Sequence, residues 1–164
     1  MNIKQIMEEF DESRCKIIDN LFKEQIINKM LKTYSNVNDI HYLWSHLKIS
    51  DKDNKKIKIM ADNNYYLSLL ERLKKEKIYV IIDKECFFDT EEHILISTDS
   101  IAFLKVLCKY YWELDEIYVF DERCSFLISV NHMFDIQFVG EQICKLFEKI
   151  NNDILIKKYI IKEY

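Results

Sequence analysis

His132 and Asp135 are the two residues of this chain whose types and spacing could support acid–base chemistry. An imidazole titrates near neutral pH, and a neighbouring carboxylate can fix its tautomer. The sequence offers no nucleophile, second histidine or oxyanion donor for the same place, and Asn131 and Asp135 are also ordinary turn residues. We therefore predict no catalytic residue, and an enzyme built on His132 and Asp135 is kept as an alternative.

The other histidines and the cysteines do not form a recognisable metal site. His41 and His46 lie five positions apart in a predicted helix, which separates them by roughly 140° around its axis. They cannot ligate one metal from a single face, as an i, i+4 pair would. The five cysteines are dispersed without a C-x-x-C pair, and no D-x-D-x-D-G loop is present. We therefore expect neither a metal nor a cofactor.

Gly140 is the only glycine, and the chain contains no proline. Loops that bind phosphate or dinucleotides need several glycines, because only glycine lets a backbone turn tightly against a phosphate. The sequence therefore excludes a Walker A loop, a G-x-G-x-x-G fingerprint and a G-x-S-x-G nucleophile elbow.

Charge and hydropathy exclude two further classes of partner. The formal net charge is −4, whereas a nucleic-acid-binding protein needs a basic surface to displace counterions. No apolar run approaches the roughly 20 residues of a membrane span, and the N-terminal residues do not resemble a secretion signal. We expect a cytoplasmic protein that binds neither nucleic acid nor membrane.

The first half of the chain is predicted to be mainly helical. Apolar residues recur at helical spacing over residues 3–31, as one bent helix or two, and again over 40–47. Residues 50–58 are rich in lysine and aspartate and indicate a charged loop, with a short strand at 58–60. A further helix is expected over 62–75.

The second half is predicted to form a sheet with two more helices. Its clearest element is Ile78–Ile82, a nearly continuous β-branched run that is typical of an inner strand. Asp99 is a plausible helix N-cap, and the helix after it places Ile101, Leu104, Leu107, Cys108 and Tyr111 toward the core. The other expected elements are a strand at 94–96, a meander of strands at 116–120, 125–130 and 134–139, a helix at 141–150, and either a strand or a helix at 153–163.

This order predicts a single α+β domain over residues 1–164, helical in 1–75 and sheet-containing in 76–164. The N-terminal helices would pack on a mixed, largely antiparallel sheet that ends in a three-strand meander.

Acidic residues gather around the predicted strands. A solvated surface is the commoner interpretation, and the alternative is a negative patch that selects a basic partner and speeds encounter. Tandem aromatic residues cannot all face one core, and exposed aromatics often anchor protein interfaces. The candidate partner-binding set is Asp83, Glu85, Asp89, Glu91, Glu92, Glu113, Asp115, Glu116, Asp121, Glu122, Tyr111, Trp112 and His132.

The segment from Asp115 to Gly140 resembles the immunity proteins of bacterial polymorphic or contact-dependent growth inhibition toxin systems. The resemblance lies in a strand containing Ile-Tyr-Val, a strand ending at Asn131 and His132, and a strand ending at Gly140 before a helix. Met133 stands where a second histidine can follow the first, so the resemblance does not supply a paired-histidine site.

The resemblance implies a cytoplasmic inhibitor that binds a toxin's catalytic domain, a nuclease in many such systems, and blocks its active site. The acidic patch would then occupy the place of nucleic acid. A small intracellular enzyme, a protein-binding adaptor and a phage-encoded inhibitor are the alternatives.

Overall fold

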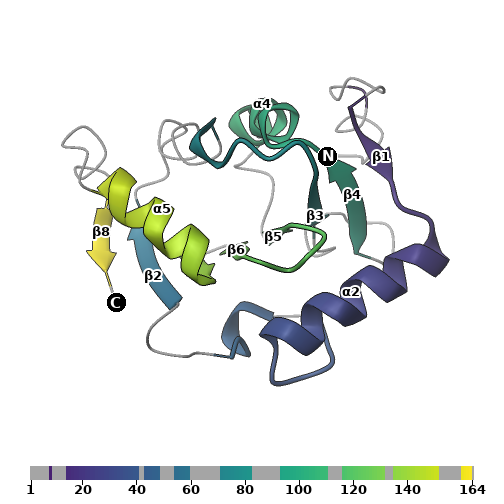
Figure 1. Cartoon of the computed structure of the whole chain (residues 1–164), viewed down its shortest axis with the longest axis horizontal. Helices are drawn as coiled ribbons and strands as arrows, with labels where there is room; N and C mark the ends of the chain where they lie inside the picture. Colours follow the sequence, from purple (N-terminus) through teal and green to yellow (C-terminus); the bar gives the residue numbers. More distant parts are fainter. Residues whose placement is uncertain are drawn as a thin grey trace.

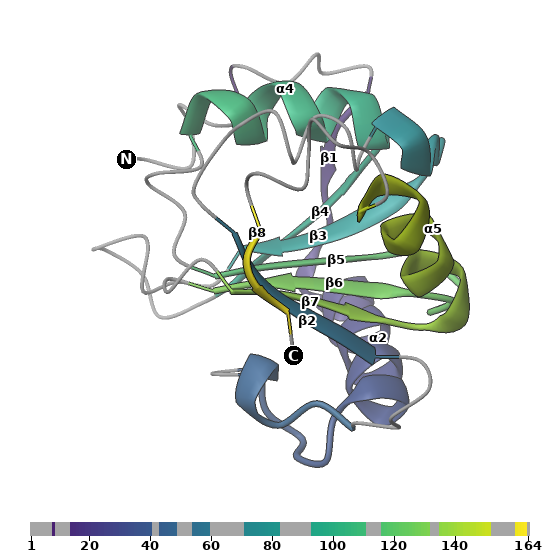
Figure 2. The same cartoon turned by 90° about the vertical axis from the view of Figure 1, so that its left-hand side faces the viewer.

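A computed structural model of the chain describes residues 8, 14–40, 43–48, 54–59, 71–82, 93–110, 116–131, 135–151 and 160–163. Within these residues an eight-stranded sheet runs through the molecule with helices on both of its faces (Figure 1, Figure 2). The strand order is β1-β4-β3-β5-β6-β7-β2-β8, and every pairing is antiparallel. The predicted α+β class is therefore confirmed.

The strands are short, and those at the centre of the sheet are almost entirely apolar. Their bounds are β1 (Lys16–Ile17), β2 (Asn54–Ile59), β3 (Ile78–Ile82), β4 (Ile94–Thr98), β5 (Ile117–Phe120), β6 (Leu127–Val130), β7 (Asp135–Val139) and β8 (Ile160–Glu163). All residues of β3, β5 and β6 are buried. Continuous apolar strands of this kind are expected where both faces of a sheet are covered.

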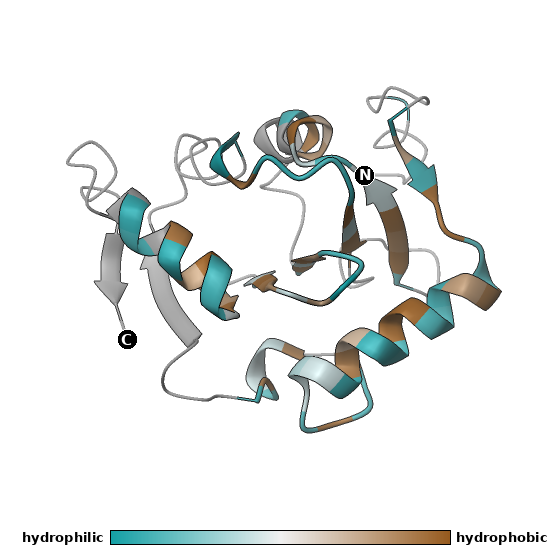
Figure 3. Ribbon diagram, in the orientation of Figure 1, coloured by the Kyte–Doolittle hydropathy of each residue, from teal (hydrophilic) through white to brown (hydrophobic). Residues whose placement is uncertain are grey.

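The helices divide between the two faces, as Figure 2 shows. One face carries α2 (Asn20–Tyr34) and the short 3₁₀ helix η1 (Leu43–Ser45), and the other carries α4 (Ser100–Tyr110) and α5 (Glu141–Asn151). Apolar and hydrophilic residues alternate in bands along α2 and α5 (Figure 3), as expected for helices that bury one side.

The core under α2 joins the helix to the middle of the sheet. Met30 and Tyr34 of α2 are buried in one cluster with Ile81 of β3 and Tyr118 of β5. Ile40, Leu43 and Leu47, which flank or form η1, belong to the same cluster. The segment after α2 therefore extends the covering layer over the sheet.

Most predictions for the second half are confirmed. β3, β4, the β5–β6–β7 meander and α5 lie where their patterns placed them. In the segment expected to be either a strand or a helix, Ile160–Glu163 form a strand, and residues 153–159 lie outside the described residues. Asp99 does cap α4, because its Oδ1 accepts hydrogen bonds from the backbone N–H groups of Ile101 and Ala102 at 2.9 Å each.

The predicted inward face of α4 is wrong at Ile101, the one member of that set whose side chain is described. Ala102, Phe103 and Val106 are buried, whereas Ile101 is 46% exposed. The pattern contained apolar residues on nearly every side of this helix, so spacing alone could not identify the buried stripe. Leu104, Leu107, Cys108 and Tyr111 lie outside the residues whose side chains are described.

The predicted helix over 3–31 is wrong at its centre. Lys16 and Ile17 form β1, which pairs with Ser97 and Ile96 of β4, and α2 begins only after its N-cap, Asp19. The helical spacing of apolar residues continues across β1 and α2 by chance. Such spacing reports only on neighbouring residues and cannot show that a strand some eighty residues away will pair with this segment.

Three other expectations for the first half need correction. The charged loop at 50–58 contains most of β2, which lies between β7 and β8, so pairing on both sides overrides the low strand propensity of its lysines. The helix expected over 40–47 is only the three-residue η1. Residues 71–73 are helical, while the rest of the helix predicted over 62–75 lies outside the described residues. Two strands of the sheet thus come from the half expected to be helical.

Gly140 connects β7 to α5 in a conformation that other residues rarely adopt. Its φ is +113°, and a Cβ atom built on it would lie 2.7 Å from the carbonyl oxygen of Ser125. Both the backbone conformation and the close approach of the β5–β6 turn therefore require a residue without a side chain.

We expect Gly140→Ala to destabilise the protein by at least ~2 kcal/mol, because strain at φ > 0 adds to a clash with backbone that cannot move cheaply. Urea unfolding would measure the change in the free energy of unfolding. Gln142→Ala, at an exposed position in the first turn of α5, is the matched control and should change it by less than ~0.5 kcal/mol. An unchanged unfolding midpoint for Gly140→Ala would contradict the geometry.

Candidate functional site

The structure describes three members of the predicted partner-binding set. These are Glu116, Asp121 and Glu122, which lie just before and just after β5. The other members lie outside the described residues: Asp83, Glu85, Asp89, Glu91, Glu92, Glu113, Asp115, Tyr111, Trp112 and His132.

Glu116 does not belong to an exposed acidic patch. It is 1% exposed, and its carboxylate accepts hydrogen bonds from Trp44 Nε1 and from the hydroxyl of Tyr118, both at 2.8 Å. The indole comes from η1 and the hydroxyl from β5. Because a buried carboxylate needs such donors to offset its lost hydration, we interpret Glu116 as a link between η1 and the sheet.

Asp121 is also turned inward, where it shapes the turn between β5 and β6. Its Oδ1 accepts from the backbone N–H of Ser125 at 2.7 Å, and its Oδ2 accepts from the Ser125 hydroxyl at 2.5 Å. Lys75 Nζ approaches Oδ2 at 3.4 Å. Burial alone would raise the pKa of Asp121, but the two hydrogen bonds from Ser125 and the Lys75 ammonium outweigh it and lower that pKa.

Helix α2 is fastened to the same turn. The Tyr34 hydroxyl donates a hydrogen bond to the carbonyl oxygen of Cys124, which has a left-handed φ of 52°. Lys29 Nζ donates to the carbonyl oxygen of Glu122 at 2.6 Å. Burial is the main cause of a raised pKa at Tyr34, so its hydroxyl stays protonated and remains a donor. Glu122 itself is exposed and contacts Lys77 at 3.3 Å.

The described surface has a concentration of exposed apolar side chains around β1. The exposed fraction is 47% for Ile17 of β1, and 69% and 56% for Leu21 and Phe22 in the first turn of α2. Ile101, in the first turn of α4, adds a fourth. We call Ile17, Leu21, Phe22 and Ile101 the β1 corner. Among the described large apolar residues only Val37 is similarly exposed elsewhere.

A cleft opens beside the β1 corner. Two adjoining cavities of about 640 and 360 Å³ share Arg14 and Glu76, and we call them together the β1 cleft. The larger one also contains Ile101, and the smaller one contains Cys15 and Lys16 at the start of β1. The described residues that line the cleft are Arg14, Cys15, Lys16, Glu71, Lys74, Lys75, Glu76, Lys77, Ser97, Thr98, Asp99, Ser100 and Ile101.

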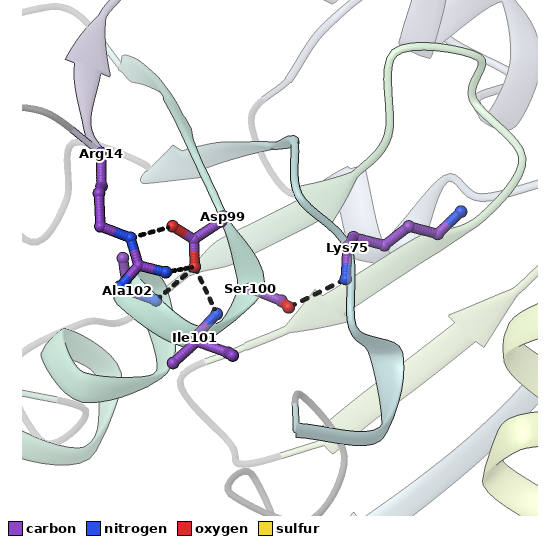
Figure 4. Close-up of polar contacts among 6 residues, drawn as sticks. All are labelled: Arg14, Lys75, Asp99, Ser100, Ile101 and Ala102. Atoms are coloured by element: carbon purple, nitrogen blue, oxygen red, sulfur yellow. Dashed lines mark hydrogen bonds and ion pairs between the residues drawn. The ribbon is translucent and has the colours of Figure 1, made fainter.

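An ion pair holds the wall of this cleft together, as Figure 4 shows. Arg14 Nε and Nη2 contact the two carboxylate oxygens of Asp99 at 2.7 Å each. The same carboxylate caps α4, and the Ser100 hydroxyl accepts a hydrogen bond from the backbone N–H of Lys75 at 3.1 Å. The segment before β1, the start of α4 and the segment before β3 are thereby fixed relative to one another.

The described groups offer little for covalent or metal chemistry. Burial raises the pKa of Cys15 to about 12, so this thiol stays protonated at neutral pH and is a poor nucleophile. Among the described residues, no group of three or more His, Cys, Asp or Glu side chains could hold a metal ion. Asp135 of the predicted His–Asp pair opens β7 opposite Lys58 of β2, whereas His132 lies outside the described residues.

Comparison with known proteins does not assign the chain to a family. No protein-family model matches it, and no characterised protein is significantly similar to it in sequence. Among the described helices, none is long and apolar enough to cross a membrane.

We expect Asp121→Asn to lower the free energy of unfolding at neutral pH by about 1 kcal/mol. The carboxylate accepts hydrogen bonds at two oxygens, whereas the amide of asparagine has only one acceptor oxygen. The folded pKa of Asp121 lies below the unfolded value of 3.8, so its contribution is present above pH 3.8 and is lost as the pH falls through the folded pKa. Urea unfolding of both proteins at neutral pH and below pH 3.8 should show the difference shrink.

Glu122→Gln is the control, since the exposed Glu122 carboxylate should contribute within ~0.5 kcal/mol at either pH. A difference between wild type and Asp121→Asn that stays constant from neutral pH to well below 3.8 would refute this assignment.

Proposed function

We propose that the chain is a cytoplasmic immunity protein, which binds a cognate bacterial toxin domain, a nuclease, and neutralises it by blocking its active site. The observation that carries the proposal is the β1 corner. Four large apolar side chains are exposed around one strand at the edge of the sheet, beside a cleft. Protein interfaces concentrate their binding energy in such apolar anchors, surrounded by polar groups.

The resemblance supports the same proposal from another part of the chain. Its segment, Asp115 to Gly140, contains β5, β6 and β7, which are consecutive in the sheet. The single glycine that ends the resemblance is also the residue on which the close contact with Ser125 depends. The features that suggest an immunity protein are therefore structural features of the sheet.

A neutralising partner must bury enough surface for a stable complex. A typical interface buries about 800 Å² on each partner, and the β1 corner with its cleft is a suitable centre for one. The number of acidic residues in the candidate set favours a basic nuclease as the partner, because complementary charge speeds encounter and selects the partner.

Co-expression tests the proposal directly. The protein encoded beside this chain's gene would be induced in a bacterial test strain, with and without the chain. We expect arrest of growth without the chain, and restored growth with it. Failure of well-expressed chain to protect the strain, or a neighbouring protein that is harmless on its own, would overturn the proposal.

The stoichiometry of inhibition separates this function from the enzymatic alternative. If the chain blocks the toxin by binding, nuclease activity should fall linearly to zero at one chain per toxin domain. An enzyme that uses His132 and Asp135 would inactivate an excess of toxin at substoichiometric amounts. An adaptor or a phage-encoded inhibitor would not restore growth against the neighbouring gene product.

A further inference from the structure

We propose that the C-terminal half of α2 and the β5–β6 turn form a docking surface for an acidic face of a partner protein. The surface consists of four exposed cations, Lys29, Lys32, Lys48 and Arg123, which we call the α2 basic patch. The inference goes beyond the proposed function, because it concerns a surface other than the β1 corner and does not depend on the partner being a toxin.

Hydrogen bonds bring the members of the patch together. Lys29 and Lys32 are three positions apart in α2, so they lie on one face of the helix. Lys48 Nζ donates to the carbonyl oxygen of Lys32 at 2.6 Å. Lys29 Nζ donates to the carbonyl oxygen of Glu122 at 2.6 Å, which holds the helix against the backbone next to Arg123. The patch is therefore contiguous, although its members come from three parts of the chain.

The contacts of Lys29 and Lys48 leave their charges available to a partner. Each ammonium group has three N–H donors, and the hydrogen bond to a neutral carbonyl oxygen uses one of them. Both side chains are thus held in place before a partner arrives. Binding then costs less conformational entropy than it would with two freely rotating lysines.

The described carboxylates do not neutralise the patch. The ion pairs in the described part of the chain are Arg14–Asp99, Lys75–Asp121, Lys77–Glu122 and Lys145–Glu141. Within that part, none of the four patch cations has a carboxylate partner. The stretch from Gln25 to Lys48 contains one acidic residue, Asp39, although the whole chain has a formal net charge of −4. The patch is therefore a basic surface on an acidic protein.

The end of α2 accounts for only part of this arrangement. The partial negative charge at a helix C-terminus attracts cations, and Lys32 lies in the last turn. The helix dipole amounts to only about half a negative charge at that end. It cannot offset four cations, and Arg123 belongs to a turn outside the helix. An excess of positive charge remains for a partner to meet.

The surroundings of the patch favour a protein over a nucleic acid. A nucleic acid gains affinity when many of its phosphates are neutralised, whereas this chain offers four cations here and is acidic as a whole. Val37 follows the end of α2 and is 36% exposed, so it supplies an apolar contact beside the cations. Protein interfaces combine such contacts with charged groups. Carboxylates of the partner would accept from the lysine ammonium groups and from the guanidinium of Arg123.

The α2 basic patch and the β1 corner lie at opposite ends of α2 (Figure 1). Leu21 and Lys32 are separated by roughly 16 Å along the helix axis, at 1.5 Å per residue. One surface is apolar and the other is charged. Substitutions in the patch can therefore be tested while the β1 corner remains intact.

Peptides test the inference without an identified partner. One short capped peptide would place aspartate and glutamate around a central leucine, and a second would carry asparagine and glutamine in place of the acids. Binding to the intact chain would be followed by NMR at low and at high salt. We expect the acidic peptide to bind about tenfold more tightly than the amide peptide at low salt. The amide shifts should centre on the second half of α2 and the β5–β6 turn, and the difference in affinity should shrink at high salt.

Charge reversal makes the test specific. Lys32→Glu and Arg123→Glu should each weaken binding of the acidic peptide about tenfold, because an attraction becomes a repulsion. Among the described contacts, neither side chain takes part in a hydrogen bond or an ion pair, so the fold should be kept. Thermal unfolding would verify this.

Lys105→Glu is the matched control. It changes the net charge by the same amount, but Lys105 is exposed on α4, which covers the other face of the sheet (Figure 2). We expect it to change the affinity by less than about twofold, because charges separated by more than a Debye length are largely screened.

Several results would overturn the inference. They are equal affinity for the two peptides, no binding of the acidic peptide, shifts centred elsewhere, or an equal loss of affinity with Lys105→Glu. Tighter binding of a short single-stranded DNA than of the acidic peptide, at the same residues, would assign the patch to nucleic acid. A harmless neighbouring gene product would overturn the proposed function and leave this surface in place, whereas failure of the peptides would remove the surface and leave the proposed function in place.

Discussion

The turn between β5 and β6 is the point at which the two covering layers of this sheet are joined. Asp121 folds the turn back on Ser125, and Tyr34 of α2 binds its Cys124 carbonyl from one face. From the other side, the backbone at Gly140 packs against Ser125 where α5 begins. A single turn of a few residues therefore sets the positions of a helix on each face, and this is why the only glycine of the chain stands at 140.

The elements that could be predicted are those whose signals are local. β3 is a continuous apolar run, and the strands of the meander are joined by short polar connections. Asp99 caps α4 through the backbone N–H groups two and three residues further along the chain. β1 could not be predicted, and only the last two residues of β2 fell within the short strand expected at 58–60, because each becomes a strand through pairing with a distant partner. Lysine-rich β2 has few apolar residues that would predict a strand. It becomes a strand because it pairs with β7 on one side and β8 on the other.

The same distinction applies to the candidate site. The sequence identified Glu116 and Asp121 as acidic residues near β5, but their burial depends on Trp44, Ser125 and Lys75, which only the fold brings to them. Arg14 carried no signal at all, since its partner Asp99 lies 85 positions away. The helical spacing of residues 3–31 predicts that Ile17, Leu21 and Phe22 belong to a buried stripe, whereas the structure exposes all three. Their spacing suited a core, and only the interruption at β1 shows that they face solvent.

The strand order also has a consequence for how this chain must fold. Lys16 pairs with Ser97 and Asn54 with Val139, so the two N-terminal strands close loops of roughly 80 residues each. Closing such loops has an entropic cost that no local contact offsets at the outset. We therefore expect β1 to pair only after β4 has formed, and β2 only after β7 of the meander has formed. On this expectation the middle of the sheet forms first from the C-terminal half, and the N-terminal segment joins it later, against the order in which the chain is synthesised.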